Sequence, residues 1–228
     1  ASAAREATAA RALTTGPFAE IAEAVLARAL ARTNATEALA HELPEPSNTA
    51  PDWSALEWAF ARAVITLHGV SPLLAKSIRW QGPPGWNRFL AEQRAHTEAR
   101  YERIVELLQV LDSSARHAGI PFVALKGAAL HSLGIYTAGE RPMADVDILL
   151  REQDAEAAAG MLESLQFRET LRSPRHRVFE PSHSEPAAAF GENSANALKI
   201  EMHTHVAENL PLRTVDLSAQ LFPIDPHP

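Results

Sequence analysis

Apolar residues recur at helical spacing through the first half of the chain, which predicts a helical region. In residues 17–32 the spacing places four side chains on one stripe: Phe18, Ile21, Val25 and Ala29. A second stripe predicts a helix that Asp52 caps and that ends near Gly69, and it consists of Leu56, Phe60, Val64 and Leu67. Stripes of this kind are typical of helices that pack on a core.

Two further helices are expected before residue 119. One is short and covers residues 72–80, where the segment 81–85, with its two prolines and two glycines, ends it. The other is long and covers residues 86–118, with Gly119 at the position of a left-handed C-cap.

The pattern changes near residue 119 to short apolar runs with turns between them. Four runs predict strands, over residues 120–125, 143–150, 177–180 and 198–206, and two segments predict helices, over 126–135 and 154–165. This order predicts an α+β fold, in which a small mixed sheet carries helices on one face and follows an all-helical N-terminal region. We place the boundary so that residues 1–118 are helical and residues 119–228 form the second domain.

Composition narrows the class of protein. The 228 residues are 46% hydrophobic and 21% charged, with a formal net charge of −7, which disfavours a surface devoted to nucleic acid. The absence of cysteine excludes disulfides, thiolate metal sites and a cysteine nucleophile. No apolar run approaches the roughly 20 residues that span a bilayer, and the first residues lack the order of a secretory signal. We therefore expect a cytoplasmic protein without a membrane partner.

Asp145 and Asp147 are the most informative pair of polar residues. In a strand, residues two apart point to the same face, so both carboxylates project together. Two like charges at this spacing favour a divalent cation such as Mg²⁺ between them, although a solvated strand entrance would also explain the pair.

Residues on either side of this strand add to the cation hypothesis. Lys126 and Gly127 lie where a strand meets a helix, a place at which backbone N–H groups and a lysine can meet phosphate. Arg141 precedes Asp145 by four residues and can pair with a phosphate oxygen or form a surface ion pair. Glu201 shares one strand face with His203 and His205 and offers a third carboxylate. The two histidines also permit zinc, but the pattern is weak and a plain polar face is favoured.

Residues 125–150 resemble the motif of the nucleotidyltransferase superfamily that shares the DNA polymerase β palm, in particular its branch of uncharacterised bacterial nucleotidyltransferases. The positions that carry the resemblance are Lys126, Gly127, Tyr136, Arg141, Asp145 and Asp147, with a later acid-x-His strand at Glu201-Met202-His203. The resemblance covers about residues 100–210. Ala128 departs from it, because many members have Ser or a second Gly there.

The resemblance implies a metal-dependent transfer of a nucleoside monophosphate from an NTP to an acceptor hydroxyl, with release of pyrophosphate. Asp145, Asp147 and Glu201 would be the catalytic ligands of Mg²⁺ or Mn²⁺. Lys126, Gly127, Ala128 and Arg141 would bind the nucleotide. The acceptor is open: RNA, a protein or a small molecule.

Two other functions remain open on the same fold. One is a non-catalytic nucleotide-binding or interaction module, which the Ala128 departure favours. The other is the toxin of a toxin–antitoxin pair that modifies tRNA or protein. A basic cluster at Arg168, Arg172, Arg175, His176 and Arg177 could hold an RNA or nucleotide acceptor, or could be a solvated loop.

Overall fold

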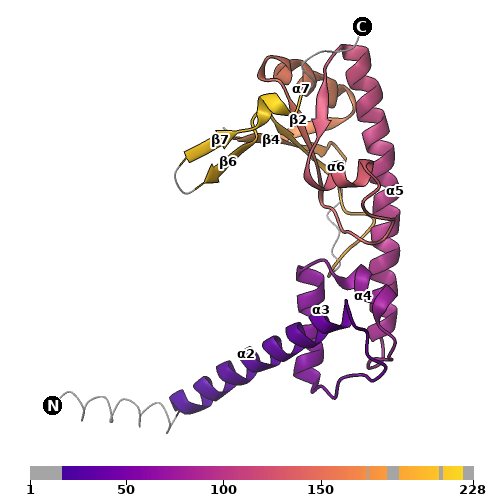
Figure 1. The fold of residues 1–228 in the computed structure, drawn as a ribbon, viewed down its shortest axis with the longest axis vertical. Helices are drawn as coiled ribbons and strands as arrows, with labels where there is room; N and C mark the ends of the chain where they lie inside the picture. Colours follow the sequence, from indigo (N-terminus) through magenta and orange to yellow (C-terminus); the bar gives the residue numbers. More distant parts are fainter. Residues whose placement is uncertain (1–16, 174, 184–189, 211–212, 223–228) are drawn as a thin grey trace, which may run out of the picture. The chain divides into compact units, whose positions relative to one another are not determined.

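The computed structural model describes residues 17–173, 175–183, 190–210 and 213–222. The chain forms two compact units that meet between Leu90 and Ala91. This division falls inside the long helix rather than at the change of composition near residue 119, and the domain boundary there stays a prediction. Figure 1 traces the chain through both units.

The first unit consists of helices, as expected. They are α2 (Pro17–Glu42), α3 (Ala55–Leu67) and α4 (Ser71–Ser77). α2 contacts the core of this unit through Ala35 and Leu39, which are almost fully buried. In the stripe predicted nearer its start, Ile21 and Val25 are 60% and 59% exposed and Ala29 is exposed, because α2 runs beyond the core it contacts; the side chain of Phe18 lies outside the described part of the chain.

The start and the packing face of α3 also differ from the prediction. Ser54, not Asp52, is the N-cap: its side chain accepts from the backbone N–H of Glu57, whose carboxylate accepts from the backbone N–H of Ser54. The buried residues are Ala61 and Ile65, so the helix face that packs lies beside the predicted stripe. Among the described residues no single helix is long and apolar enough to cross a membrane; α3 and α4 meet the criterion only as a pair bent by 114°.

The long helix α5 has the predicted bounds, Trp86–Ala118. Gly119 follows it with a φ of 68°, which glycine adopts without a steric penalty. The backbone N–H of Ile120 donates to the carbonyl oxygen of Ala115 and closes the helix end. The chain therefore turns from α5 directly into the first strand.

The second unit contains a five-stranded mixed sheet, which confirms the predicted α+β class. Its strands are β1 (Phe122–Ala124), β2 (Asp145–Leu150), β3 (Phe167–Arg172), β4 (His176–Pro181) and β5 (Lys199–His203). The order across the sheet is β1-β2-β5-β4-β3, in which only β2 and β5 are parallel. Helix α6 (Lys126–Ser132) follows β1, and α7 (Ala155–Ser164) follows β2 after a short 3₁₀ turn, Glu152–Asp154.

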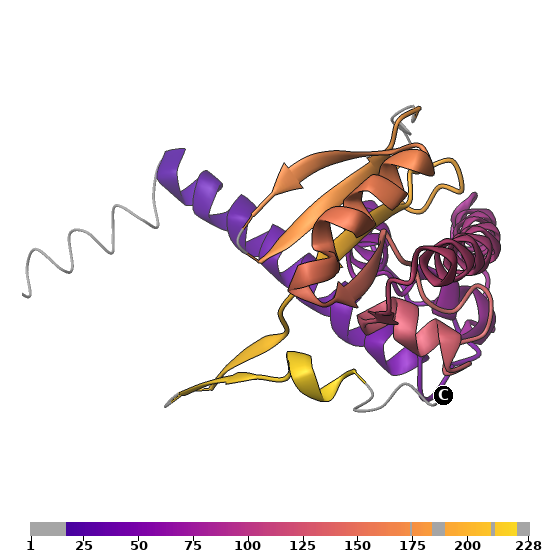
Figure 2. The same cartoon turned by 90° about the horizontal axis from the view of Figure 1, so that it is seen from above.

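The sheet has two chemically different faces. We call one the helix face, because its side chains form a core with residues of α5 and α7; it includes Val146, Ile148, Leu150, Phe179, Ile200 and Met202. Figure 2 draws the ribbons of the sheet and of these helices. We call the other the site face. The register places on it Asp145, Asp147, Leu149, His176, Val178, Glu201 and His203. Strand alternation separates these two sets, as predicted for β2 and β5.

Three strands were not predicted. β3 is missed because its sequence is mostly polar and its side chains are largely exposed. The other two, β6 (Ala207–Leu210) and β7 (Arg213–Asp216), form a hairpin apart from the five-stranded sheet (Figures 1 and 2). A second 3₁₀ turn, Ser218–Gln220, follows them.

Candidate functional site

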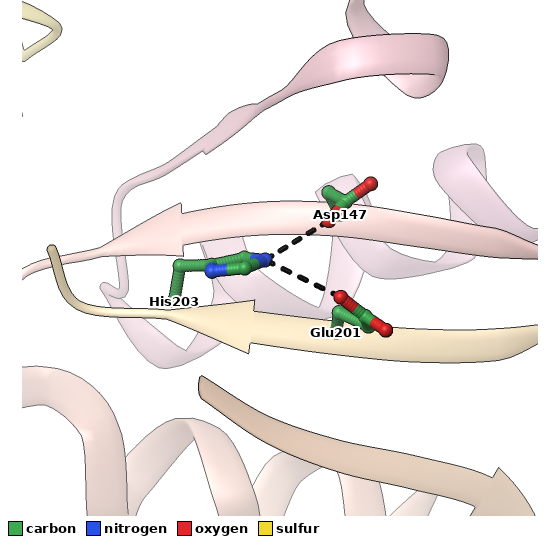
Figure 3. Close-up of side chains that lie close together, drawn as sticks. All are labelled: Asp147, Glu201 and His203. Atoms are coloured by element: carbon green, nitrogen blue, oxygen red, sulfur yellow. Dashed lines mark hydrogen bonds and ion pairs between the residues drawn. The ribbon is translucent and has the colours of Figure 1, made fainter. Parts of the chain in front are cut away.

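The pairing of β2 with β5 brings two carboxylates together. In this parallel register Asp147 is the direct partner of Glu201, and Leu149 is the partner of His203. Paired strands lie about 4.8 Å apart, so side chains on the same face of partner residues are neighbours. Figure 3 shows Asp147 on one strand, with Glu201 and His203 on the next.

The carboxylate of Asp147 is the centre of this site, and its side chain is only 3% exposed. Lys126 Nζ donates to Asp147 Oδ1 at 2.7 Å, and His203 Nε2 lies 2.9 Å from the same oxygen. His203 Nε2 is also 3.7 Å from Glu201 Oε2 (Figure 3). A buried carboxylate without such partners would be strongly disfavoured, so these contacts are what allow Asp147 to sit here.

The ionisation of the site follows from these contacts. Burial acts to raise the pKa of Asp147, but the hydrogen bonds from His203 and Lys126 outweigh it and leave the pKa below its usual value. The hydrogen bond to Asp147 raises the pKa of Lys126, against the opposing effect of burial. At neutral pH the pair is therefore a carboxylate and an ammonium. Because a carboxylate only accepts, His203 presents Nε2–H to it.

Lys126 reaches Asp147 from a strained turn between β1 and α6. Its φ of 46° lies in the left-handed region, which residues with a Cβ seldom adopt and which is concentrated at functional sites. The backbone N–H of Leu125 donates to the carbonyl oxygen of Asp147 at 2.9 Å and holds this turn against β2. The Lys126 side chain is nevertheless 60% exposed, so a ligand from solvent can reach the ammonium.

The next two residues are buried. A Cβ at Gly127 would lie 3.0 Å from Met143 Sδ, so glycine allows α6 to pack closely on that side chain. The side chain of Ala128 belongs to the core of this unit. Close packing therefore explains the glycine by itself, and contact of the two backbones with a nucleotide stays a prediction.

Arg141 lies just before β2, and Asp145 is the first residue of that strand. Asp145 is half-buried on the site face, and its charge contributes to the raised pKa of Lys126. It is not a member of the group in which Asp147, Glu201 and His203 bring their ligand atoms within 4.8 Å of one another. The guanidinium of Arg141 lies over the ring of Tyr136, 5.4 Å from its centre. A metal role for Asp145 and a nucleotide role for Arg141 stay predictions.

A buried arginine, which the sequence analysis missed, anchors the two strands of the site. Arg100, in the middle of α5, is 2% exposed. Its Nε and Nη2 donate to the carbonyl oxygen of Met143 at 3.1 and 2.6 Å, and its Nη1 donates to that of Asn196 at 2.8 Å. Met143 shortly precedes β2 and Asn196 shortly precedes β5. One guanidinium therefore ties together the entries of the strands that carry Asp147 and Glu201.

The sequence of α5 contains an indication of this anchor, because polar residues occupy positions where the helical spacing expects apolar ones. Between Leu90 and Ile104, the buried positions of the helix are filled by polar residues, Gln93, Thr97 and Arg100. Gln93 accepts from the backbone N–H of Glu192 and donates to its carbonyl oxygen, so this polar part of the helix binds the connector that leads to β5. Buried polar residues on a helix indicate backbone partners elsewhere, but the pattern alone does not say which ones.

Two arginines of the basic cluster, Arg172 and Arg177, are engaged in ion pairs. Arg177 Nη2 lies 2.5 Å from Glu169 Oε2, and Arg172 Nε lies 2.8 Å from Glu169 Oε1. Both arginines also approach Glu156 on α7. Hydrogen bonds from Arg172 and then Arg177 lower the pKa of Glu169 to about 2. These two arginines stabilise the outer strands of the sheet, Arg168 and Arg175 are exposed, and RNA binding by the cluster stays a prediction.

The residues of the site fit a divalent cation by their chemistry. Two carboxylates and one imidazole place ligand atoms within 4.8 Å of one another. The buried carboxylate, that of Asp147, forms an ion pair with the ammonium of Lys126. Oxygen ligands suit Mg²⁺ and Mn²⁺, and an imidazole nitrogen suits transition metals. The site is therefore able to hold a cation on the side of Asp147 that faces Glu201.

Comparison with known proteins identifies the family. The chain matches the family described as uncharacterised nucleotidyltransferases over residues 54–225, more than half of the 228 residues, and the match includes every site residue discussed above. Neither a curated protein nor a solved structure is similar enough to match the chain. The resemblance carried by Lys126, Asp145 and Asp147 is confirmed: the chain belongs to this family of uncharacterised nucleotidyltransferases.

Proposed function

We propose that this chain is a metal-dependent nucleotidyltransferase that moves a nucleoside monophosphate from an NTP to an acceptor hydroxyl. The hydroxyl oxygen forms a bond to the α-phosphorus, and the bond from that phosphorus to the oxygen bridging it to the β-phosphorus breaks. Pyrophosphate leaves with the electron pair, and the hydroxyl proton passes to solvent. The observation that carries the proposal is the convergence of Lys126, Glu201 and His203 on the buried carboxylate of Asp147.

Asp147 and Glu201 are the residues that would hold the cation, with Asp145 on the same strand face. When bound, Mg²⁺ or Mn²⁺ neutralises phosphate charge and lowers the pKa of the attacking hydroxyl. The burial of Asp147 keeps its carboxylate oriented and limits competition from water. Family membership supports nucleotidyl transfer in general, and these side chains support its dependence on a cation.

Lys126 is suited to bind the triphosphate. Its ammonium has three N–H donors, one of which is directed to Asp147, and its exposed side chain can turn toward a phosphate without moving the backbone. The raised pKa keeps it charged at neutral pH. Gly127, Ala128 and Arg141 are assigned to the nucleotide in the same proposal, through backbone N–H groups and a guanidinium.

Labelled NTP separates nucleotidyl transfer from other reactions. The purified chain, Mg²⁺ or Mn²⁺ and cell extract should label an acceptor from α-³²P NTP but not from γ-³²P NTP, because the γ-phosphate leaves in pyrophosphate. Combining Asp145→Ala with Asp147→Ala should abolish the label. Asp112→Ala is the matched control, since this carboxylate lies on α5 and pairs with Arg116.

Two outcomes would contradict the proposal. Equal labelling by the double variant would remove the catalytic assignment. Nucleotide binding that persists without a divalent cation, with no pyrophosphate released, would indicate a non-catalytic nucleotide-binding module. If labelling occurs, the acceptor recovered from the extract distinguishes RNA, protein and small molecule, and growth arrest on expression would indicate a toxin.

A further inference from the structure

We infer that His203 is a direct ligand of the cation and gives the site a preference for a divalent transition metal such as Mn²⁺ over Mg²⁺. The inference rests on the proposed function and deepens it by naming the class of cofactor. It starts from the group of side chains that actually converge: two carboxylates and an imidazole, rather than three carboxylates.

The position of His203 is that of a ligand. Its Nε2 is directed between the two carboxylates, 2.9 Å from Asp147 Oδ1 and 3.7 Å from Glu201 Oε2 (Figure 3). A cation held by these two oxygens would therefore meet the ring nitrogen as well. On binding, the imidazole would give up the Nε2–H that it presents to Asp147, bind the cation through Nε2 and carry its one proton on Nδ1, the usual arrangement for a histidine ligand.

The ring of His203 is held in this orientation by its surroundings. Its side chain is 13% exposed, and on the other side His176, its direct partner on β4, lies 5.4 Å away between ring centres. His205, two residues further on, is exposed and hydrogen-bonds to Thr204. The two histidines of this segment therefore have different surroundings, and only His203 belongs to the converging group.

The composition of the donor set determines which cation it favours. Mg²⁺ prefers oxygen ligands and keeps several waters, so an imidazole adds little to its binding. Transition metals gain from a nitrogen ligand, and their affinities at mixed sites follow a rising order from Mn²⁺ onward. Two carboxylates and one imidazole should therefore bind Mn²⁺ more tightly than Mg²⁺. A set of three carboxylates would give a smaller difference in affinity.

Binding measurements on the whole chain test this inference without reference to catalysis. Mn²⁺ affinity is measured from the electron paramagnetic resonance of free Mn²⁺, and Mg²⁺ affinity by calorimetry. The key variant is His203→Gln, whose amide N–H still donates to Asp147 but whose nitrogen cannot bind a metal; His203→Ala is the second variant, and His205→Ala is the matched control. We expect His203→Gln to weaken Mn²⁺ binding about 10- to 100-fold and Mg²⁺ binding by less than about 3-fold.

The spectrum of bound Mn²⁺ gives an independent readout. Electron spin echo modulation from one imidazole ¹⁴N should be present in the wild type and in His205→Ala, and absent from both His203 variants. Absence of the nitrogen signal from the wild type, or equal loss of both metals in His203→Gln, would show that His203 only positions Asp147 and would overturn the inference.

Asp147→Asn distinguishes failure of the inference from failure of the proposed function. If Asp147→Asn abolishes transfer and binding of both metals while His203→Gln behaves as the wild type, the function stands and the inference is wrong. If Asp147→Asn retains both metal binding and transfer, the proposed function itself is wrong.

Discussion

The two faces of the sheet are built from the same strands but bury different kinds of side chain, apolar ones on the helix face and a carboxylate on the site face. On the helix face, Val146 and Ile148 are buried among apolar side chains of α5 and α7. On the site face, Asp147, which lies between them in the sequence, is almost as inaccessible to solvent. Burial therefore does not distinguish the core of this unit from its site. What distinguishes them is compensation of charge, because Asp147 is held by Lys126 and His203.

The helix face also carries charge, in a group of ion-paired side chains at the outer strands β4 and β3 and the neighbouring helix α7. Arg177 lies two residues from the core residue Phe179 and is buried against Glu169 and Glu156. The innermost pair of this network is largely enclosed, since the side chains of Arg177 and Glu169 are 10% and 21% exposed, whereas that of Lys126 on the site face is 60% exposed. The ammonium of Lys126 is therefore open to a ligand, and the guanidinium of Arg177 is not.

The largest effect is expected from a cavity on the helix face. Ile148→Ala should lower the free energy of unfolding by about 2–5 kcal/mol, because it removes buried methyl groups from a side chain that is 1% exposed. Urea denaturation measures the change. Val110→Ala is the control, since Val110 is 46% exposed on α5 and should change stability by less than about 0.5 kcal/mol. Similar losses in both variants would contradict the assignment of the core.

On the site face, a substitution should reduce activity strongly and stability less than the substitution on the helix face does. Asp147→Asn should reduce nucleotidyl transfer about 100-fold or more, because it removes the charge that the cation requires. The amide is close in size to the carboxylate, so the variant should lose less unfolding free energy than Ile148→Ala. Labelled-NTP transfer and urea denaturation on the same preparation test the pair of statements. A destabilisation as large as that of Ile148→Ala, with transfer retained, would remove the contrast between the faces.

Arg100 lies on α5, which packs on the helix face, and it holds the entries of the two strands that carry the site, so its variants should affect both stability and the site. Arg100→Met removes both side-chain donors to the carbonyl oxygen of Met143 and the shorter of two to that of Asn196, which keeps Arg103 Nη1 at 3.2 Å. The change should cost about 1–3 kcal/mol of unfolding free energy. Because these carbonyls precede β2 and β5, Mn²⁺ affinity should fall as well. Arg100→Lys should recover part of both losses through its remaining donors. Loss of stability with an unchanged Mn²⁺ affinity, measured well below the unfolding transition, would show that the anchor does not align the site.

The smallest effect is expected from the ion pairs at the edge of the helix face. The pKa of Glu169 is about 2 in the folded chain, below the ordinary 4.5, so its contribution to stability is complete above pH 4.5 and is lost as the pH falls through about 2. Glu169→Gln should therefore lower stability at pH 7, by no more than about 1 kcal/mol, and the difference from wild type should shrink below pH 4.5. Urea denaturation at several pH values measures it. A difference that grows on acidification would contradict the assigned pairing.

The parts of the fold that follow from local pattern could be predicted from the sequence. The helical spacing of apolar residues over 86–118, with Gly119 after it, predicts both ends of α5. Strict alternation in β2 and β5 predicts that Asp145 and Asp147 share a face and that Glu201 and His203 share a face. These features depend only on the period of the element, which is why they could be read without knowing its neighbours.

Features that depend on a distant partner could not be predicted in this way. The contact of His203 with Asp147 requires the parallel register of β2 and β5, and the burial of Arg100 requires the path of the connector before β5. The exposure of Ile21 has the same origin, because helical spacing says which face is apolar but not how far the core extends. For the same reason β3, whose exposed polar residues give little signal, was missed.

The parallel pairing of β2 and β5 has a consequence for the order in which the group of Asp147, Glu201 and His203 is assembled. The two strands are joined by a long crossover that includes α7, β3 and β4, so the loop between them must close before the pair can form. A growing polypeptide that has ended at β4 already contains Lys126 and Asp147 but lacks Glu201 and His203. Under the proposed function, the cation site is therefore complete only once β5 has docked between β2 and β4, and a chain that lacks this pairing is expected not to consume nucleotide by this route.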